Sequence, residues 1–180
     1  MAVKDNNITF VFDLDQTLIN SDHRCNFSPE GQVDLKYWLL NHTEVNVMKD
    51  TLLPLASFAQ KLSKICQSHN SWRIVASTAR IMKPFDMQYL KLHGLVFNAI
   101  YSRNAIDFSS SDALKKGHID KELSLFKHNK IIFFEDNKQV LEMASKYNCI
   151  DVVDSIKLNK MIFSEKMSYC DILVFLGILD

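Results

Sequence analysis

Short apolar runs alternate with helix-length amphipathic stretches along most of the chain, from ITFVFDL at 8–14 to CIDVVD at 149–154. Strands separated by helices pair in parallel through right-handed crossovers, which place helices on both faces of the sheet. The sequence therefore predicts an α/β fold with a three-layer, Rossmann-like parallel sheet. At 180 residues the chain is expected to form a single domain, 1–180.

The individual elements follow from periodicity, with short apolar runs read as strands and apolar residues at helical spacing as helices. The expected strands are 8–14, 72–78, 97–103, 130–136 and 149–154. The expected helices are 51–65, 85–94, 111–126, 138–147 and 157–167. Asp50 or Thr51 is the expected N-cap of the first helix. The last ten residues fit either a helix or a strand.

Residues 19–49 do not fit the alternation. They lie between the first strand and the next expected helix, where a direct connection needs only a few residues. Insertions at the ligand end of a sheet often act as lids. We therefore expect 19–49 to form a flap or small cap over the site. The alternative is a surface excursion without a part in ligand binding.

Charge and cysteine content narrow the class of protein. Twenty-one basic and 21 acidic residues give zero net charge, which argues against non-specific binding to a polyanion. The cysteines are widely spaced, which predicts free thiols: Cys25, Cys66, Cys149 and Cys170. The apolar run at 172–179 is far too short for a membrane helix, and 1–10 has no apolar signal region. We expect a cytoplasmic protein that does not contact membranes.

Three of the expected strands end in polar side chains: FDLD at 12–15, ST at 77–78 and FFED at 133–136. In open α/β sheets the ligand site lies at the carboxyl ends of the strands. One acidic strand end is often only a loop residue or a helix cap. Three polar ends at the same edge of a sheet predict a functional site.

Asp13 and Asp15 project from the same face of their strand and reach one small volume, because they are two residues apart. Two carboxylates there suit Mg²⁺, which prefers a few carboxylates together with water and phosphate oxygens. They also suit a division of labour in which one acid attacks and the other exchanges a proton. Asp136, with Glu135 beside it, could complete the shell of the cation.

Four segments resemble, in order, the signature motifs of the haloacid dehalogenase (HAD) superfamily of aspartyl-phosphate phosphotransferases. DLDQTL at 13–18 has the form DxDx[TV], and IVASTAR at 74–80 resembles a strand that ends in Ser or Thr. SSSDALKKGHI at 109–119 resembles the motif with a lysine at the start of a helix. IIFFEDNKQVLEMA at 131–144 resembles the acidic fourth motif. The resemblance covers roughly residues 8–155 and implies a HAD phosphatase fold.

Within that superfamily the chain resembles the subgroup that includes the 3′-phosphatase domain of phage polynucleotide kinase and its small stand-alone relatives. The positions that match its pattern are Asp13, Asp15, Thr17, His23, Arg24, Trp38, Thr78, Arg80, Arg103, Asp112, Lys115 and the segment 135–143. Three positions depart from it: Gln16 replaces Gly, Glu135 replaces the first Asp of an acidic pair, and Asn137 replaces Arg. The missing Arg and the neutral net charge weigh against a polynucleotide substrate.

The resemblance implies a catalytic role for each motif residue. Asp13 would attack phosphorus, and Asp15 would protonate the leaving alkoxide and then deprotonate water. Mg²⁺ would be bound by Asp13, Asp136 and the backbone carbonyl of Asp15. Thr78 and Lys115 would bind phosphoryl oxygens. Ser77 is the alternative to Thr78, and Lys116 is the alternative to Lys115. Lys115 could also be a solvated lysine on the helix face without a catalytic role.

The same resemblance makes five further residues candidates for substrate binding: Thr17, His23, Arg24, Arg80 and Arg103. For the last two, structural ion pairs or surface charges are the alternative. Phe27, Tyr37 and Trp38 could stack on a nucleobase, although packing in the core or the flap is the expected use.

These observations predict a Mg²⁺-dependent phosphomonoester hydrolase that works through an aspartyl-phosphate. A nucleotide is the expected substrate. Neutral charge favours a nucleoside monophosphate, whereas the subgroup favours a 3′-phosphorylated nucleic-acid end. Two alternatives stay open: a phosphatase of another small phosphorylated metabolite, and a HAD-like domain that binds a nucleotide or partner without turnover. A kinase or phosphotransferase with a P-loop fits the sequence poorly, since the chain lacks GxxxxGK[ST] and has only four glycines.

Overall fold

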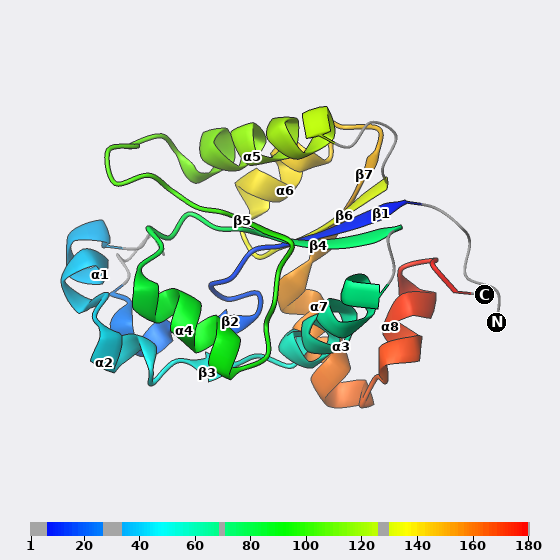
Figure 1. Cartoon of the computed structure of the whole chain (residues 1–180), viewed down its shortest axis with the longest axis horizontal. Coiled ribbons are helices and arrows are strands. Elements are labelled where there is room, and N and C mark those ends of the chain that lie inside the picture. The colour runs from blue at the N-terminus through cyan, green and yellow to red at the C-terminus, as the bar shows by residue number, and fades with distance from the viewer. Residues whose placement is uncertain (1–6, 27–33, 69–70, 126–129, 180) are drawn as a thin grey trace.

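The computed structural model describes residues 7–26, 34–68, 71–125 and 130–179. Its centre is a five-stranded sheet in the order β5-β4-β1-β6-β7, and every neighbouring pair is parallel (Figure 1). The strands are β1 (Ile8–Phe12), β4 (Trp72–Ser77), β5 (Ala99–Tyr101), β6 (Lys130–Glu135) and β7 (Ile150–Asp154). Each lies inside its predicted range, and the predicted Rossmann-like parallel sheet is confirmed.

Helices cover both faces of this sheet. The helices after residue 50 are α3 (Leu55–Ser68), α4 (Pro84–Leu92), α5 (Ser111–Leu125), α6 (Lys138–Ala144), α7 (Ser155–Glu165) and α8 (Tyr169–Phe175). Figure 1 shows α5 and α6 on one side of the sheet, and α3, α7 and α8 on the other. The C-terminal stretch that fitted either element is therefore helical in α8.

Side chains of the central strands alternate between two hydrophobic cores. Phe10, Phe12 and Phe134 belong to the core on the α3 side, where Phe12 and Phe134 stack with ring centroids 4.3 Å apart. Val11 and Phe133 belong to the core on the α5 and α6 side. Because a strand has a period of two residues, this alternation fixes which face each residue beyond the strand ends will reach.

The expected N-cap of the first long helix is wrong. The helix α3 begins at Leu55, and Thr51–Leu52 instead forms β3, which pairs antiparallel with β2 (Ile19–Asn20). The amide of Leu53 donates to the carbonyl of Leu18, which continues this pairing. Pro54 follows, and it favours a helix start because it has no amide proton and a fixed φ.

The predicted flap, 19–49, contains several short elements. They are β2, the 3₁₀ turn η1 (Asp22–Arg24), α1 (Leu35–Asn41) and α2 (Glu44–Val47). The side chains of Asp34 and Thr43 cap α1 and α2 by accepting backbone amides. Figure 1 shows α1 and α2 beside α4, at the end of the molecule where the central strands finish. Residues 27–33, including Phe27, lie outside the described residues.

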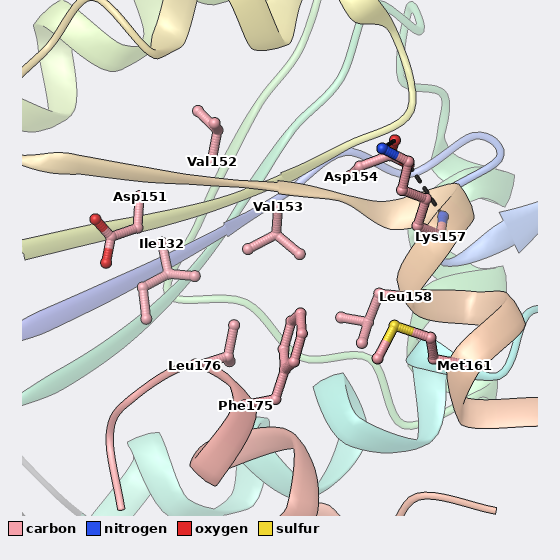
Figure 2. A pocket seen from close by; sticks show the side chains of 10 residues that line it. All are labelled: Ile132, Asp151, Val152, Val153, Asp154, Lys157, Leu158, Met161, Phe175 and Leu176. Atoms are coloured by element: carbon pink, nitrogen blue, oxygen red, sulfur yellow. Dashed lines mark hydrogen bonds and ion pairs between the residues drawn. The ribbon is translucent and has the colours of Figure 1, made fainter. Parts of the chain in front are cut away.

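An apolar hollow of about 320 Å³ lies between the outer strand β7 and the helices α7 and α8 (Figure 2). Val153, Leu158 and Phe175 are among its lining residues, and Lys157 pairs with Asp154 at 3.4 Å. None of the sequence-predicted site residues lines it. The hollow is therefore distinct from the candidate site.

All four cysteines are free, as predicted. Within the described part of the chain, no helix combines the length and the hydrophobicity required to cross a bilayer.

Candidate active site

Three neighbouring strands place polar side chains in one row at their carboxyl ends. Phe12 lies level with Ala76 of β4 and Phe134 of β6. The next residues, Asp13, Ser77 and Glu135, therefore continue the row on the face covered by α5. The order of the strands thus brings the first, second and fourth motifs together, as the sequence predicts.

Lys115 lies in the first half of α5 and reaches this row. Its Nζ donates to Asp13 Oδ1 at 2.7 Å and to Glu135 Oε2 at 2.6 Å, and all three side chains are buried. Lys116 is exposed and pairs with Asp120 at 2.6 Å. The structure therefore places Lys115, and not Lys116, beside the candidate nucleophile. A buried ammonium at this position can neutralise charge that develops on a transferred phosphoryl group.

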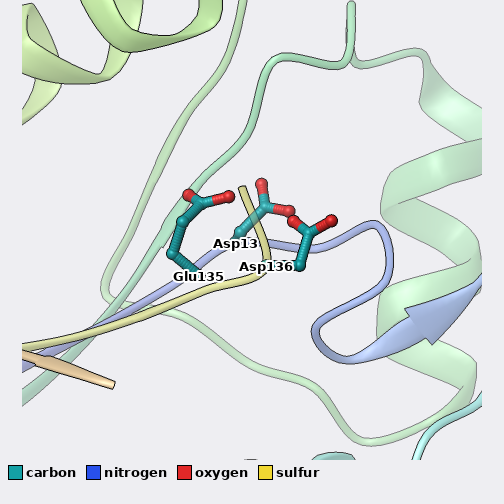
Figure 3. A group of neighbouring side chains, drawn as sticks. All are labelled: Asp13, Glu135 and Asp136. Carbon is teal, nitrogen blue, oxygen red and sulfur yellow. The ribbon is translucent and has the colours of Figure 1, made fainter. Parts of the chain in front are cut away.

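The carboxylates of Asp13, Glu135 and Asp136 form an acidic cluster (Figure 3). One oxygen of each lies within 4.8 Å of the others. Burial raises the pKa of Asp13 and of Glu135 to about 7 despite the opposing effect of Lys115, and it raises the pKa of Asp136 to about 6. An all-oxygen donor set of this kind fits a hard divalent cation such as Mg²⁺.

Asp15 points to a different set of partners. Its carboxylate accepts from Arg80 Nη2 at 2.6 Å and Nε at 3.1 Å, and from Ser21 Oγ at 2.6 Å. Arg24 Nη2 lies 3.5 Å away. Although burial opposes ionisation, Arg80 and then Arg24 hold the pKa of Asp15 well below its usual range. The side chain is therefore an ionised acceptor in this structure, and it is not part of the acidic cluster.

The two arginines join a partly exposed acid, Asp15, to two buried ones in an ion-pair network that consists of Asp15, Arg24, Asp50, Arg80 and Asp86. Arg24 binds Asp50 in bidentate fashion, at 2.9 and 3.0 Å. Arg80 Nη1 donates to Asp86 Oδ1 at 2.7 Å, and its Nη2 lies 3.6 Å from Asp50 Oδ2. Arg24 and Arg80 are only 1% and 2% exposed. The network joins the ends of the segment 19–50 to α4 and to the loop after β4.

Trp38 of α1 packs against this network. The guanidinium of Arg24 lies 5.5 Å from the centroid of the Trp38 ring, and the ring of His42 lies 4.5 Å from it. Among the described residues, Arg24 Nη1 has no hydrogen-bond partner, and the face of the Trp38 ring over the guanidinium partly compensates for this. Trp38 thus packs within the segment 19–49, against Arg24 and His42.

The end of β4 distinguishes Thr78 from Ser77. The hydroxyl of Thr78 accepts from the amide of Arg80 at 3.1 Å, which leaves its proton available to donate. Ser77 Oγ lies 2.9 Å from His118 Nδ1 on α5. Burial, and next Lys115, lower the pKa of His118 to about 4, so the ring is neutral at pH 7. Thr78 is therefore the better candidate for binding a phosphoryl oxygen.

The other three predicted substrate-binding residues, like Arg24 and Arg80, have partners within the protein. Thr17 Oγ1 is buried 2.8 Å from Ser155 Oγ, and His23 Nε2 lies 3.0 Å from the carbonyl of Asn46. Arg103 donates to three backbone carbonyls, of residues 79, 107 and 109. The structure does not bring these three side chains to the acidic cluster. Their part in substrate binding stays a prediction.

The parallel sheet has a HAD-like fold, with a cluster of three carboxylates at its carboxyl edge. A comparison with protein families identifies the family of the chain. The model of the family described as bacteriophage T5 5′-deoxynucleotidase matches residues 1–172, and the chain belongs to that family. A search of curated proteins gives no match.

Solved structures share the fold at low identity. A haloacid dehalogenase-like hydrolase from Streptococcus pneumoniae is similar over 96% of this chain and 99% of its own length, with a TM-score of 0.60 and 12% identity. A chain of the Pnkp1/Rnl/Hen1 RNA repair complex is similar over 84% of this chain, with a TM-score of 0.59 and 14% identity. This chain spans 44% of the length of that one. At such identities the likeness concerns the fold alone.

Proposed function

We propose that this phosphatase hydrolyses nucleoside monophosphates, with 5′-deoxynucleotides as the first substrates to test. The observation that carries the proposal is the contact of Lys115 Nζ with Asp13 at 2.7 Å, beside Asp136 in the acidic cluster. This contact brings the candidate nucleophile, Asp13, next to the positive charge of the Lys115 ammonium group. The family name supports the nucleotide, and the neutral net charge suits a small substrate better than a polyanion.

In the proposed reaction Asp13 attacks phosphorus and forms an aspartyl-phosphate as the bond from phosphorus to the ester oxygen breaks. The leaving alkoxide takes a proton from Asp15. Water then attacks phosphorus, returns a proton to Asp15 and releases inorganic phosphate together with free Asp13. Lys115 and Thr78 bind the non-bridging oxygens and keep the phosphoryl group in line with Asp13.

The contacts of Asp15 add a requirement to this scheme. Arg80 and Arg24 favour its ionised form, whereas a general acid must carry a proton. We infer that substrate binding weakens at least one of these arginine contacts before Asp15 can protonate the leaving group. Arg80 is the natural candidate, because it makes the shorter of the two arginine contacts and so does most to keep Asp15 ionised. Its guanidinium can instead turn towards the anionic substrate.

The residues present fit a magnesium ion. Asp13 and Asp136 would bind it, together with the backbone carbonyl of Asp15, while both oxygens of Glu135 already accept hydrogen bonds, from Lys115 Nζ and from the amide of Asn137. When bound, Mg²⁺ would neutralise charge on the phosphoryl oxygens and help to orient them.

Magnesium should stabilise the folded protein, because clustered carboxylates gain a counter-ion only in the native state. A magnesium concentration of 100 times Kd would add about 2.7 kcal/mol to the free energy of unfolding, which would raise the thermal midpoint by several degrees. Asp136→Ala should lose most of this rise, whereas Asp151→Ala, at an exposed site on β7, should retain it. Scans in MgCl₂ and in NaCl of equal ionic strength separate binding from screening. Equal rises in wild type and Asp136→Ala would contradict the assigned ligand.

A substrate panel tests the proposed function. It should compare 5′- and 3′-deoxynucleotides, 3′-phosphorylated oligonucleotides and sugar phosphates, with release of inorganic phosphate as the measurement. We expect the highest kcat/KM for a mononucleotide. A preference for sugar phosphates would refute the nucleotide assignment, and release of phosphate from no substrate would favour a binding domain without turnover.

A 3′-phosphorylated nucleic-acid end is the second candidate substrate. Two chains from Pnkp1/Rnl/Hen1 complexes share the fold, with TM-scores of 0.59 and 0.54. The same panel decides between the candidates, because a polynucleotide phosphatase should prefer the oligonucleotide to the mononucleotide and lose activity steeply as salt increases.

A further inference from the structure

The loop between β5 and α5, residues 102–110, holds two large apolar side chains in solvent. Phe108 is 92% exposed and Ile106 is 80% exposed. Among the large apolar side chains of the described residues, Phe108 is the most exposed. Single exposed apolar residues are common, but here two of them lie within three positions of one loop.

Arg103 holds the backbone on both sides of Phe108. Its Nη1 donates to the carbonyl of Asp107 at 3.1 Å and to that of Ser109 at 2.7 Å. The amide of Ser109 also donates to Asp107 Oδ1 at 2.8 Å. The loop is thus braced by a charged group at the position where its aromatic side chain projects. This arrangement presents the Phe108 ring on an ordered backbone.

The same guanidinium connects the loop to the phosphate end of the site. Arg103 Nε donates to the carbonyl of Ala79 at 3.0 Å, and Ala79 directly follows Thr78. The helix α5, which carries Lys115, begins only three residues after Phe108. Figure 1 shows this loop and α1 at the same end of the molecule, on opposite sides of the edge where the central strands finish.

We propose that Phe108 is a specificity-determining residue that stacks on the nucleobase of a mononucleotide whose phosphate lies at Asp13 and Lys115. The inference rests on the proposed function and identifies the part of the substrate that the acidic cluster cannot recognise. In a mononucleotide the sugar separates the base from the phosphate by several ångström. Arg103 ties the backbone on either side of Phe108 to Ala79, next to Thr78 but outside the acidic cluster, and this placement suits that separation.

An exposed ring recognises a base by its flat apolar face. Base stacking on an aromatic side chain is tolerant of sequence, because every base has a π face. A braced loop also reduces the ordering cost of binding, since little backbone freedom remains to be lost. Phe108 should therefore favour nucleotides over sugar phosphates while accepting all four bases, with purines bound more tightly than pyrimidines because their rings are larger.

The test compares Phe108→Ala and Phe108→Trp with wild type on a deoxynucleoside 5′-monophosphate and on 2-deoxyribose 5-phosphate, which lacks the base. Removing the ring should raise KM for the nucleotide about tenfold. KM for the sugar phosphate and kcat for both substrates should change less than twofold. Phe108→Trp should retain the wild-type KM. Phe163→Ala is the matched control, because Phe163 is also highly exposed, at 80%. It lies on α7, which follows the edge strand β7, whereas Thr78 follows β4 on the other side of β1.

Each outcome has a distinct meaning. An unchanged nucleotide KM in Phe108→Ala, or an equal rise for both substrates, would overturn the role of Phe108 and leave the proposed function intact. Wild-type protein that hydrolyses the sugar phosphate at least as well as the nucleotide would refute the proposed function itself, and with it the stacking role.

Discussion

Asp13→Asn is expected to lower kcat for any phosphomonoester by at least about 10⁴-fold, because the amide cannot form the covalent intermediate. The change is nearly isosteric, and Lys115 keeps its contact with Glu135 at 2.6 Å. The fold should therefore survive the substitution. Phosphate release from p-nitrophenyl phosphate measures the effect, and the thermal midpoint checks that the variant is folded.

Asp151→Asn is the matched control for this experiment. It makes the same chemical change on the outer strand β7, where Asp151 pairs with Lys130 at the surface. It should retain wild-type kcat. Residual activity of Asp13→Asn above a few per cent would exclude Asp13 as the nucleophile, and loss of activity in both variants would point to damage unrelated to the site.

Asp50→Ala is expected to lower the free energy of unfolding by about 3–5 kcal/mol, because it removes the bidentate partner of the buried Arg24 guanidinium. The carboxylate of Asp50 is fully buried and binds Arg24 at two points. The free energy of unfolding of natural domains is only about 5–15 kcal/mol, so the variant should be close to unfolding at 37 °C. Urea unfolding at 25 °C, analysed by linear extrapolation, measures the loss.

The exposed pair between Lys130 and Asp151 provides the comparison for Asp50. Its N–O distance of 2.6 Å is as short as the contacts of the buried network, but both side chains are partly exposed to solvent. Asp151→Ala should therefore cost at most about 1 kcal/mol. Similar losses in the two variants would mean that burial does not set the strength of the network.

The five strands and three polar strand ends could be predicted from the sequence because both signals are local. A run such as KIIFFED shows its strand and its acids within seven residues. The parallel pairing of the strands then follows from the intervening helices, and the resemblance to the third HAD motif indicates Lys115. Local sequence patterns thus predict the residues of the acidic cluster. The part played by Glu135 stayed open in the sequence, and in the structure Glu135 contacts Lys115.

The segment 19–50 could not be predicted in the same way. Its strands β2 and β3 have two residues each, which is too short for any periodicity. The partners of Arg24 and Arg80 come from distant turns and from α4, so no spacing in the sequence indicates them. Asp50 and Asp86 each lie beside an expected helix start. An acid at such a position is easily taken for a helix cap, which hides its role as a partner of a buried arginine.

The alternation of side chains between the two faces of the sheet links the reaction to the architecture. Leu14 lies in the aromatic core on the α3 side, while Asp13 contacts Lys115 from α5. One residue gained or lost within β1 would exchange these two directions, sending a carboxylate into the core and a leucine to the lysine. Evolution can therefore lengthen the connections around the active site, but it cannot alter the three central strands by an odd number of residues without losing both stability and chemistry at once.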